Sequence, residues 1–158
     1  MKKFIILLLV LFCFELIGCS NSSKLIDSVL KTIPPDPGEA GKATLEGIDS
    51  DNDGVRDDIE RWIVLENENL PVKTKEKFIK HTKIYTSIMV NDNTSLDMNE
   101  QEIKASYCLE QSLGNDEDKY IHYLAQIGNT KERILKQYRM VDDVHDIDSS
   151  IMENIQCD

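Results

Sequence analysis

The sequence is poor in aromatic residues and lacks the short motifs that mark the common enzyme classes. Aromatic side chains make up 6% of its 158 residues, and it contains no Gly-rich phosphate loop, nucleophile elbow or His-Glu-x-x-His helix. The length is sufficient for one compact domain and too short for two of ordinary size. The sequence therefore argues against a large enzyme architecture, and no motif in it indicates a reaction.

Positive charge is also scarce. Lys and Arg total 18 against 29 Asp and Glu, which gives a formal net charge of −11 at pH 7. Binding to nucleic acid requires cationic side chains that neutralise phosphates, so this balance argues against a nucleic-acid partner. An acidic surface attracts divalent cations, although most acidic surfaces are simply solvated.

The sequence has no long alternation of β-branched and polar residues of the kind that forms a sheet. From residue 57 onward, apolar residues recur with the period of a helix, which predicts an all-α fold, a small helical bundle. We expect helices that start near residue 57, run from about 71–74 to 90, cover 99–113 and 120–127, begin after 129, and end with a weaker segment over 144–155. A short helix is also predicted over 24–33, followed by an aperiodic linker over 34–48.

The predicted core is built from stripes of apolar and aromatic side chains. In the helix after residue 129, Asn129 and Glu132 resemble a capping pair. The apolar stripe of that helix, which is expected to face the core, consists of Ile134, Leu135, Tyr138 and Val141. The aromatic residues expected in the core, rather than in a ligand cage or a binding groove, are Trp62, Tyr85, Tyr107, Tyr120, Tyr123 and Tyr138.

The N-terminus has the pattern of a secretory signal. Lys2 and Lys3 precede an apolar run over 4–14, and Glu15 and the polar residues 20–23 keep that run shorter than the roughly 20 residues of a membrane-spanning helix. A retained transmembrane anchor is therefore the weaker alternative.

The tetrad Leu16-Ile17-Gly18-Cys19 closes this signal and resembles the lipobox of bacterial lipoproteins. The resemblance implies that Cys19 is acylated and becomes the mature N-terminus, so that the membrane is a partner through lipid. It divides the chain into a signal peptide (1–18), a flexible lipidated tether with a short helix and a linker (19–40), and a helical domain (41–158). Since Ser20 follows the cysteine, it also implies a cell-envelope location at the outer membrane, facing the periplasm. An ordinary signal peptide with a cysteine at its cleavage site is the alternative.

Two cysteines remain for the folded domain of an exported protein. Cys13 leaves with the signal and Cys19 carries lipid, so only Cys108 and Cys157 are left. In an oxidising compartment two such thiols are expected to form one disulfide. Two unpaired thiols are the alternative, since pairing geometry cannot be read from a sequence.

Residues 49–60, with the sequence DSDNDGVRDDIE, have oxygen ligands at the spacing of a calcium loop. Gly54 at the sixth position permits the sharp bend that such a loop needs. The spacing resembles a 12-residue EF-hand loop and, more closely, the loops of thrombospondin type 3 repeats. The ligands that it implies for Ca²⁺ are Asp49, Asp51, Asp53, the main-chain carbonyl of Val55, Asp57 and Glu60. Arg56 at position eight predicts a lone site, and an acidic turn followed by helix-capping aspartates is the alternative.

Two functions fit these observations. The preferred one is a non-enzymatic, lipid-anchored envelope protein, an interaction or structural domain that Ca²⁺ stabilises and that has another envelope protein as its partner class. The alternative is a small envelope hydrolase, which a pocket with a His–acid pair away from the loop would favour. His81, His122 and His145 show no metal-ligand spacing, and we expect them at the surface or the edge of the core.

Overall fold

The computed structural model describes residues 33–91, 95–114, 116–143 and 155–157, without the side chains of 141–143. The chain divides into two units, residues 1–33 and 34–158, and the helices described below belong to the second. The predicted signal peptide with Cys19, residues 24–32 of the helix predicted over 24–33, and residues 144–154 of the segment predicted over 144–155 lie outside the described residues.

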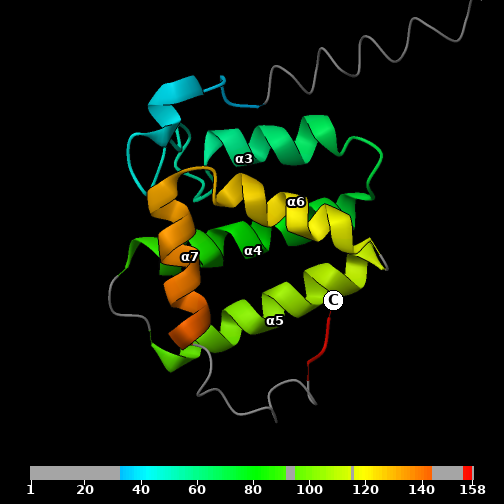
Figure 1. Cartoon of the computed structure of the whole chain (residues 1–158). Coiled ribbons are helices and arrows are strands. Elements are labelled where there is room, and N and C mark those ends of the chain that lie inside the picture. Colours follow the sequence, from blue (N-terminus) through cyan, green and yellow to red (C-terminus); the bar gives the residue numbers. More distant parts are fainter. Residues whose placement is uncertain (1–32, 92–94, 115, 144–154, 158) are drawn as a thin grey trace, which may run out of the picture. The chain divides into compact units, whose positions relative to one another are not determined.

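The described residues contain helices and no β-strand, which confirms the predicted all-α fold (Figure 1). Within the 34–48 segment, predicted as an aperiodic linker, one 3₁₀ turn forms, η1 (Gly38–Lys42). The remaining elements are α3 (Asp57–Arg61), which continues into the π-helical turn η2 (Trp62–Glu66), and then α4 (Val72–Val90), α5 (Leu96–Leu113), α6 (Glu117–Ile127) and α7 (Lys131–Asp143). Among these described helices, none is both long enough and apolar enough to cross a bilayer.

Polar caps set the first residues of α5 and α6. The Ser95 hydroxyl accepts a hydrogen bond from the Met98 backbone N–H at 3.2 Å, so α5 starts three residues before the predicted Asn99. The Asp116 carboxylate accepts one from the Lys119 backbone N–H at 3.1 Å and starts α6 in the same way. The predicted start, about Asn99, was late because it followed the apolar spacing and did not use Ser95 as a cap, whereas the predicted end at Leu113 is confirmed.

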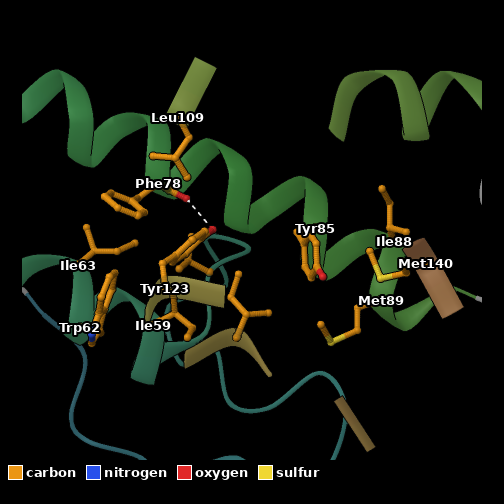
Figure 2. Packing of buried hydrophobic residues seen from close by; sticks show 12 residues of the cluster. Ile59, Trp62, Ile63, Phe78, Tyr85, Ile88, Met89, Leu109, Tyr123 and Met140 are labelled. Carbon is orange, nitrogen blue, oxygen red and sulfur yellow. Dashed lines mark hydrogen bonds between the residues drawn. The ribbon is translucent and has the colours of Figure 1, made fainter. Parts of the chain in front are cut away.

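Three aromatic rings from η2, α4 and α6 form the centre of the core (Figure 2). The ring of Phe78 meets that of Tyr123 edge-on with centroids 4.8 Å apart, and Trp62 lies 5.6 Å from Phe78 and 5.9 Å from Tyr123. Aromatic contacts of this geometry add to the stabilisation from buried area. Trp62, Tyr85 and Tyr123 are therefore core residues as predicted, and α4 packs against both α5 and α7.

A buried polar network runs beside this aromatic centre. His81 is fully buried, and its two ring nitrogens lie 2.7 Å from the Tyr123 hydroxyl and 2.8 Å from the Ser106 hydroxyl. The Ser106 hydroxyl donates in turn to the Glu102 carboxylate at 2.7 Å. The expectation that His81 lies at the surface or core edge was wrong, because these partners satisfy both ring nitrogens inside the protein. His122 is exposed, as expected.

The predicted core face of α7 was also wrong. Ile134, Leu135 and Tyr138 are 43%, 45% and 69% exposed, whereas Arg133 is fully buried. The Thr130 hydroxyl, not Asn129, accepts the hydrogen bond from the Arg133 backbone N–H at 3.2 Å. The buried side chain of Arg133 donates to main-chain carbonyls of residues 41–45, so the face of α7 that carries Arg133 is the buried one. The apolar stripe of the sequence does not indicate this contact.

Candidate metal centre

The loop over 49–60 brings three of the predicted ligands together. Carboxylate oxygens of Asp49, Asp51 and Asp53 lie within 4.8 Å of one another, at a partly exposed position suited to an ion from solvent. Like charges at this separation repel, and a cation between them removes the repulsion. Among the described residues, this is the one group of three acidic, His or Cys side chains close enough to hold a metal ion.

Left-handed backbone conformations close the turn. Asn52 has a φ of 59° and Gly54 a φ of 90°, so the glycine at position six supplies the bend that the sequence predicted. The aspartate side chains accept backbone hydrogen bonds across the turn: Asp49 from the Gly54 N–H at 2.8 Å and Asp53 from the Val55 N–H at 2.8 Å. These bonds fix the direction of the carboxylates before any ion arrives.

Asp57 and Val55, two further predicted ligands, are buried at the entrance to α3. Asp57 is 1% exposed, and its carboxylate accepts a hydrogen bond from the Ser50 N–H at 2.9 Å, while its own N–H donates to the Ile48 carbonyl at 2.8 Å. The Val55 side chain is fully buried. This burial fixes the position of Val55, whose main-chain carbonyl was predicted as a ligand. Both ends of the loop are therefore tied to the fold.

One carboxylate oxygen of Glu60, the predicted twelfth-position ligand, lacks a hydrogen-bond partner. This oxygen, Oε2, is buried. Burial, and then the negative charges of the four loop aspartates at 51, 53, 57 and 49, raise the pKa of Glu60 from its ordinary 4.5 to about 7. A proton or a cation would make this environment more favourable for the carboxylate.

An ion pair joins the acidic cluster of the loop to α4. The Lys83 ammonium of α4 lies 3.2 Å from Asp53 Oδ2. Both side chains are partly exposed, so water screens this ion pair and it contributes little to stability. Lys83 therefore reduces the charge of the acidic cluster without replacing an ion at its centre.

Arg56 anchors the end of the loop to the α6–α7 corner. Its side chain is 1% exposed and donates to Asp58 at 2.9 and 2.7 Å and to the Ile127 carbonyl at 3.0 Å. Burial alone would raise the pKa of Asp58, but the hydrogen bonds and charge of Arg56 outweigh it and lower that pKa. Asn129 joins the cluster by donating to Asp58 at 2.8 Å. Arg56 at position eight is thus a structural anchor, which its sequence position did not predict.

Arg133 of α7 anchors the segment before the loop. It donates to the Gly41 carbonyl at 2.7 Å and to the Thr44 carbonyl at 2.8 Å. At Gly47, with a φ of 73°, an added Cβ would lie 2.8 Å from the Arg133 guanidinium and 2.9 Å from the Arg56 side chain. Arg133 therefore holds the segment before the loop, and Arg56 holds the loop itself. At position 47, next to both arginine side chains, only glycine fits.

The raised pKa of Glu60 predicts a pH dependence in metal-free protein. Between pH 4.5 and 7 the folded state keeps a proton that the unfolded state has lost, so the free energy of unfolding should fall as the pH rises through this range. Urea unfolding in a chelator at pH 5, 6 and 7 measures it. The Glu60→Gln variant should lose less stability over the range than wild type, and equal slopes would contradict the assignment.

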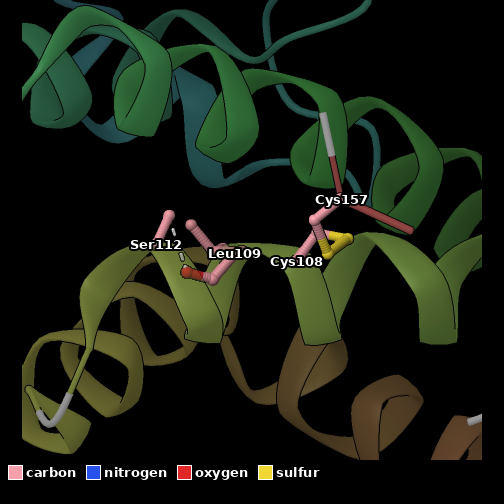
Figure 3. Close-up of a disulfide and its surroundings, with 4 residues drawn as sticks. All are labelled: Cys108, Leu109, Ser112 and Cys157. Carbon is pink, nitrogen blue, oxygen red and sulfur yellow. Dashed lines mark hydrogen bonds between the residues drawn. A yellow bond between two sulfur atoms is a disulfide. The ribbon is translucent and has the colours of Figure 1, made fainter. Parts of the chain in front are cut away.

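The predicted cysteine pair is confirmed at the level of distance. The Cα atoms of Cys108 and Cys157 are 5.4 Å apart and their sulfurs are bonded, next to the buried Leu109 (Figure 3). This distance is normal for a disulfide. The link ties residues 155–157 to the middle of α5.

No protein family, curated protein or solved structure matches the chain.

Proposed function

We propose that the protein binds one Ca²⁺ ion in the loop over 49–60, and that the ion stabilises the fold. The observation that carries this proposal is Glu60: a buried carboxylate oxygen without a hydrogen-bond partner faces the charges of four aspartates. A divalent cation would satisfy that oxygen and offset the repulsion at once.

The alternative, an acidic turn that caps a helix, explains only part of this arrangement. Backbone hydrogen bonds to Asp49 and Asp53, and the one from Ser50 to Asp57, are those of such a turn. A turn gives no reason for the buried, unpartnered oxygen of Glu60. The oxygen-only ligand set suits Ca²⁺, which accepts six to eight ligands in flexible geometry, better than Mg²⁺, which requires a small octahedron.

The anchors of the loop favour a stabilising role over a switching one. Arg56 and Arg133 hold the two flanks of the loop against the α6–α7 corner by buried hydrogen bonds. A sensor needs an element with two arrangements of similar free energy. The described loop is fixed from both sides, so the ion would reinforce one arrangement.

Titration calorimetry with CaCl₂ tests the proposal. Wild type should bind one Ca²⁺ with a dissociation constant of roughly 10⁻⁴ to 10⁻³ M, or somewhat tighter because five carboxylates contribute. Glu60→Gln should bind no measurable Ca²⁺ at free concentrations up to roughly 10⁻³ M. Glu66→Gln, the same change at an exposed position of η2, is the matched control and should titrate like wild type. Equal heats from all three proteins would contradict the proposal.

The second part of the proposed function is the lipid anchor. The signal-like N-terminus and the tetrad Leu16-Ile17-Gly18-Cys19 support export and acylation of Cys19, with the domain held at the cell envelope, on the outer membrane facing the periplasm. The partner class would be the membrane and another envelope protein.

Acylation predicts that the Cys19→Ala variant leaves the membrane fraction. Each buried methylene contributes about 0.8 kcal/mol, so two or more acyl chains outweigh the repulsion of an acidic domain from anionic lipid. Fractionation of cells that express wild type, Cys19→Ala or Cys13→Ala checks this. Cys13→Ala is the control and should stay with membranes. Membrane retention of an exported Cys19→Ala variant would contradict the anchor.

The hydrolase alternative has one structural observation in its favour and one against it. The ring of His81 lies 3.4 Å from the Glu102 carboxylate, so a His–acid pair exists away from the loop. His81 is fully buried among its hydrogen-bond partners, and no substrate could reach it without displacing them. This network fits core packing, and we therefore propose a non-enzymatic role.

A further inference from the structure

A cavity of about 430 Å³ lies between α4 and α5, away from the calcium loop. Four lysines line it: Lys73, Lys77 and Lys80 from α4, and Lys104 from α5. The three α4 lysines recur at intervals of four and three residues, which places them on one face of the helix. The volume lies within the range of small-molecule sites.

The positive charge at this cavity contrasts with the rest of the chain. Helix α4 carries five of the 14 lysines and one acidic residue, so it has a charge of +4 in a chain of −11. Among the described residues that line the cavity, four are lysines and one, Glu76, is acidic. Lys77 is already engaged in an interaction of its own. The positive charge offered to a ligand is therefore that of Lys73, Lys80 and Lys104. Lys104 also pairs with Glu100 at 2.5 Å, but exposed pairs of this kind are weak and exchange readily with a better anion. The local field therefore attracts anions to a protein that otherwise repels them.

Apolar side chains line the cavity beside the lysines. Ile84 of α4 and Ala105 and Cys108 of α5 line it, and Ala105 is buried. Gln101 and Gln156 line it as well, and Gln156 precedes Cys157, which the disulfide joins to Cys108 (Figure 3). The cavity thus combines lysine side chains with apolar ones, next to the covalent link between Cys108 and Cys157.

We propose that this cavity binds a phosphate-bearing amphiphile, with the phosphate among the lysines and a short apolar chain against Ile84, Ala105 and Cys108. Lysine ammonium groups act as point charges and suit a compact polyanion, whereas recognition of a planar carboxylate favours the paired donors of arginine, which this cavity lacks. Free phosphate would gain nothing from the apolar side chains of the lining. The ligand chemistry is a phosphate ester, whether from a soluble metabolite or from an anionic lipid headgroup.

Calorimetry of the full chain in nanodiscs of zwitterionic lipid tests this proposal, with hexyl phosphate and inorganic phosphate as the probes. Wild type should bind hexyl phosphate, and inorganic phosphate should bind at least about tenfold more weakly because it buries no methylene. The double variant Lys80→Ala/Lys104→Ala should weaken hexyl phosphate binding by about tenfold or more, since it removes two charge-assisted contacts.

The double variant Lys42→Ala/Lys131→Ala is the matched control, since it removes the same charge from exposed sites outside the cavity. It should change the affinity by less than about twofold. Equal weakening by both double variants, or equal affinity of wild type for the two probes, would overturn the proposal.

Replacing the zwitterionic lipid by an anionic one distinguishes the two sources of the phosphate ester, a lipid headgroup and a soluble metabolite. Competition with hexyl phosphate indicates a lipid headgroup, and an unchanged affinity indicates a soluble ester.

Discussion

Replacing Arg56 with alanine is expected to lower the free energy of unfolding by about 3 kcal/mol. The change removes the hydrogen bonds of a fully buried guanidinium and leaves Asp58 and the Ile127 carbonyl without their donor. Loss of one partner from a buried ion pair costs about 3–5 kcal/mol, and the lower end applies because the Asp58 side chain is still 22% exposed. Urea unfolding in a chelator measures this loss without a contribution from metal binding.

Two further variants separate anchoring from a general effect of charge. Arg139→Ala removes the same charge from an exposed position of α7 and should change stability by no more than about 0.5 kcal/mol. Arg56→Lys keeps the charge but not the paired donors, so its stability should lie between wild type and Arg56→Ala. If Arg56→Ala unfolds at the same urea concentration as Arg139→Ala, Arg56 is not an anchor.

Breaking the disulfide is expected to cost about 4 kcal/mol. The bond joins residues 49 positions apart, and closing a loop of that length removes chain entropy from the unfolded state. The Cys108→Ser/Cys157→Ser variant should therefore unfold at a lower urea concentration than oxidised wild type. Since Cys108 lies next to the fully buried Leu109, the loss should also loosen the C-terminal end of α5.

A reductant provides the control for the disulfide. Reduced wild type should resemble the double serine variant, and the variant itself should not respond to reductant. Mass spectrometry of protein taken directly from cells should show the peptides of Cys108 and Cys157 linked. Free thiols at both positions, or equal stability with and without reductant, would contradict the pairing.

The helical fold was predictable because apolar periodicity is a local property that survives in the sequence. The stripes of Trp62, Phe78 and Tyr123 indicated the core correctly. The face of α7 was not predictable, because the partners of Arg133 are carbonyls at residues 41–45, about 90 positions away in the chain. Burial of an arginine depends on such distant acceptors, which no periodicity records.

The candidate metal centre was also predictable only where its features are local in the sequence. The spacing of the acidic residues is local, and it predicted the cluster of Asp49, Asp51 and Asp53. The anchors of the loop are not local, since Arg56 bonds to residues about 70 positions later. The cavity between α4 and α5 was also missed, although lysines at 73, 77 and 80 on one helix face were a visible signal.

The measurement that tests the calcium site most directly is the melting temperature of the full chain as a function of free Ca²⁺. At ten times the dissociation constant, binding to the folded state alone adds about 1.4 kcal/mol, which corresponds to a rise of about 3–6 °C for a chain of this size. We expect this rise in wild type and in Glu66→Gln, increasing with Ca²⁺ concentration, and its absence in Glu60→Gln. If the wild-type protein melts at the same temperature in chelator and in Ca²⁺ at a concentration on the order of 10⁻³ to 10⁻² M, the loop is an acidic turn and not a metal site.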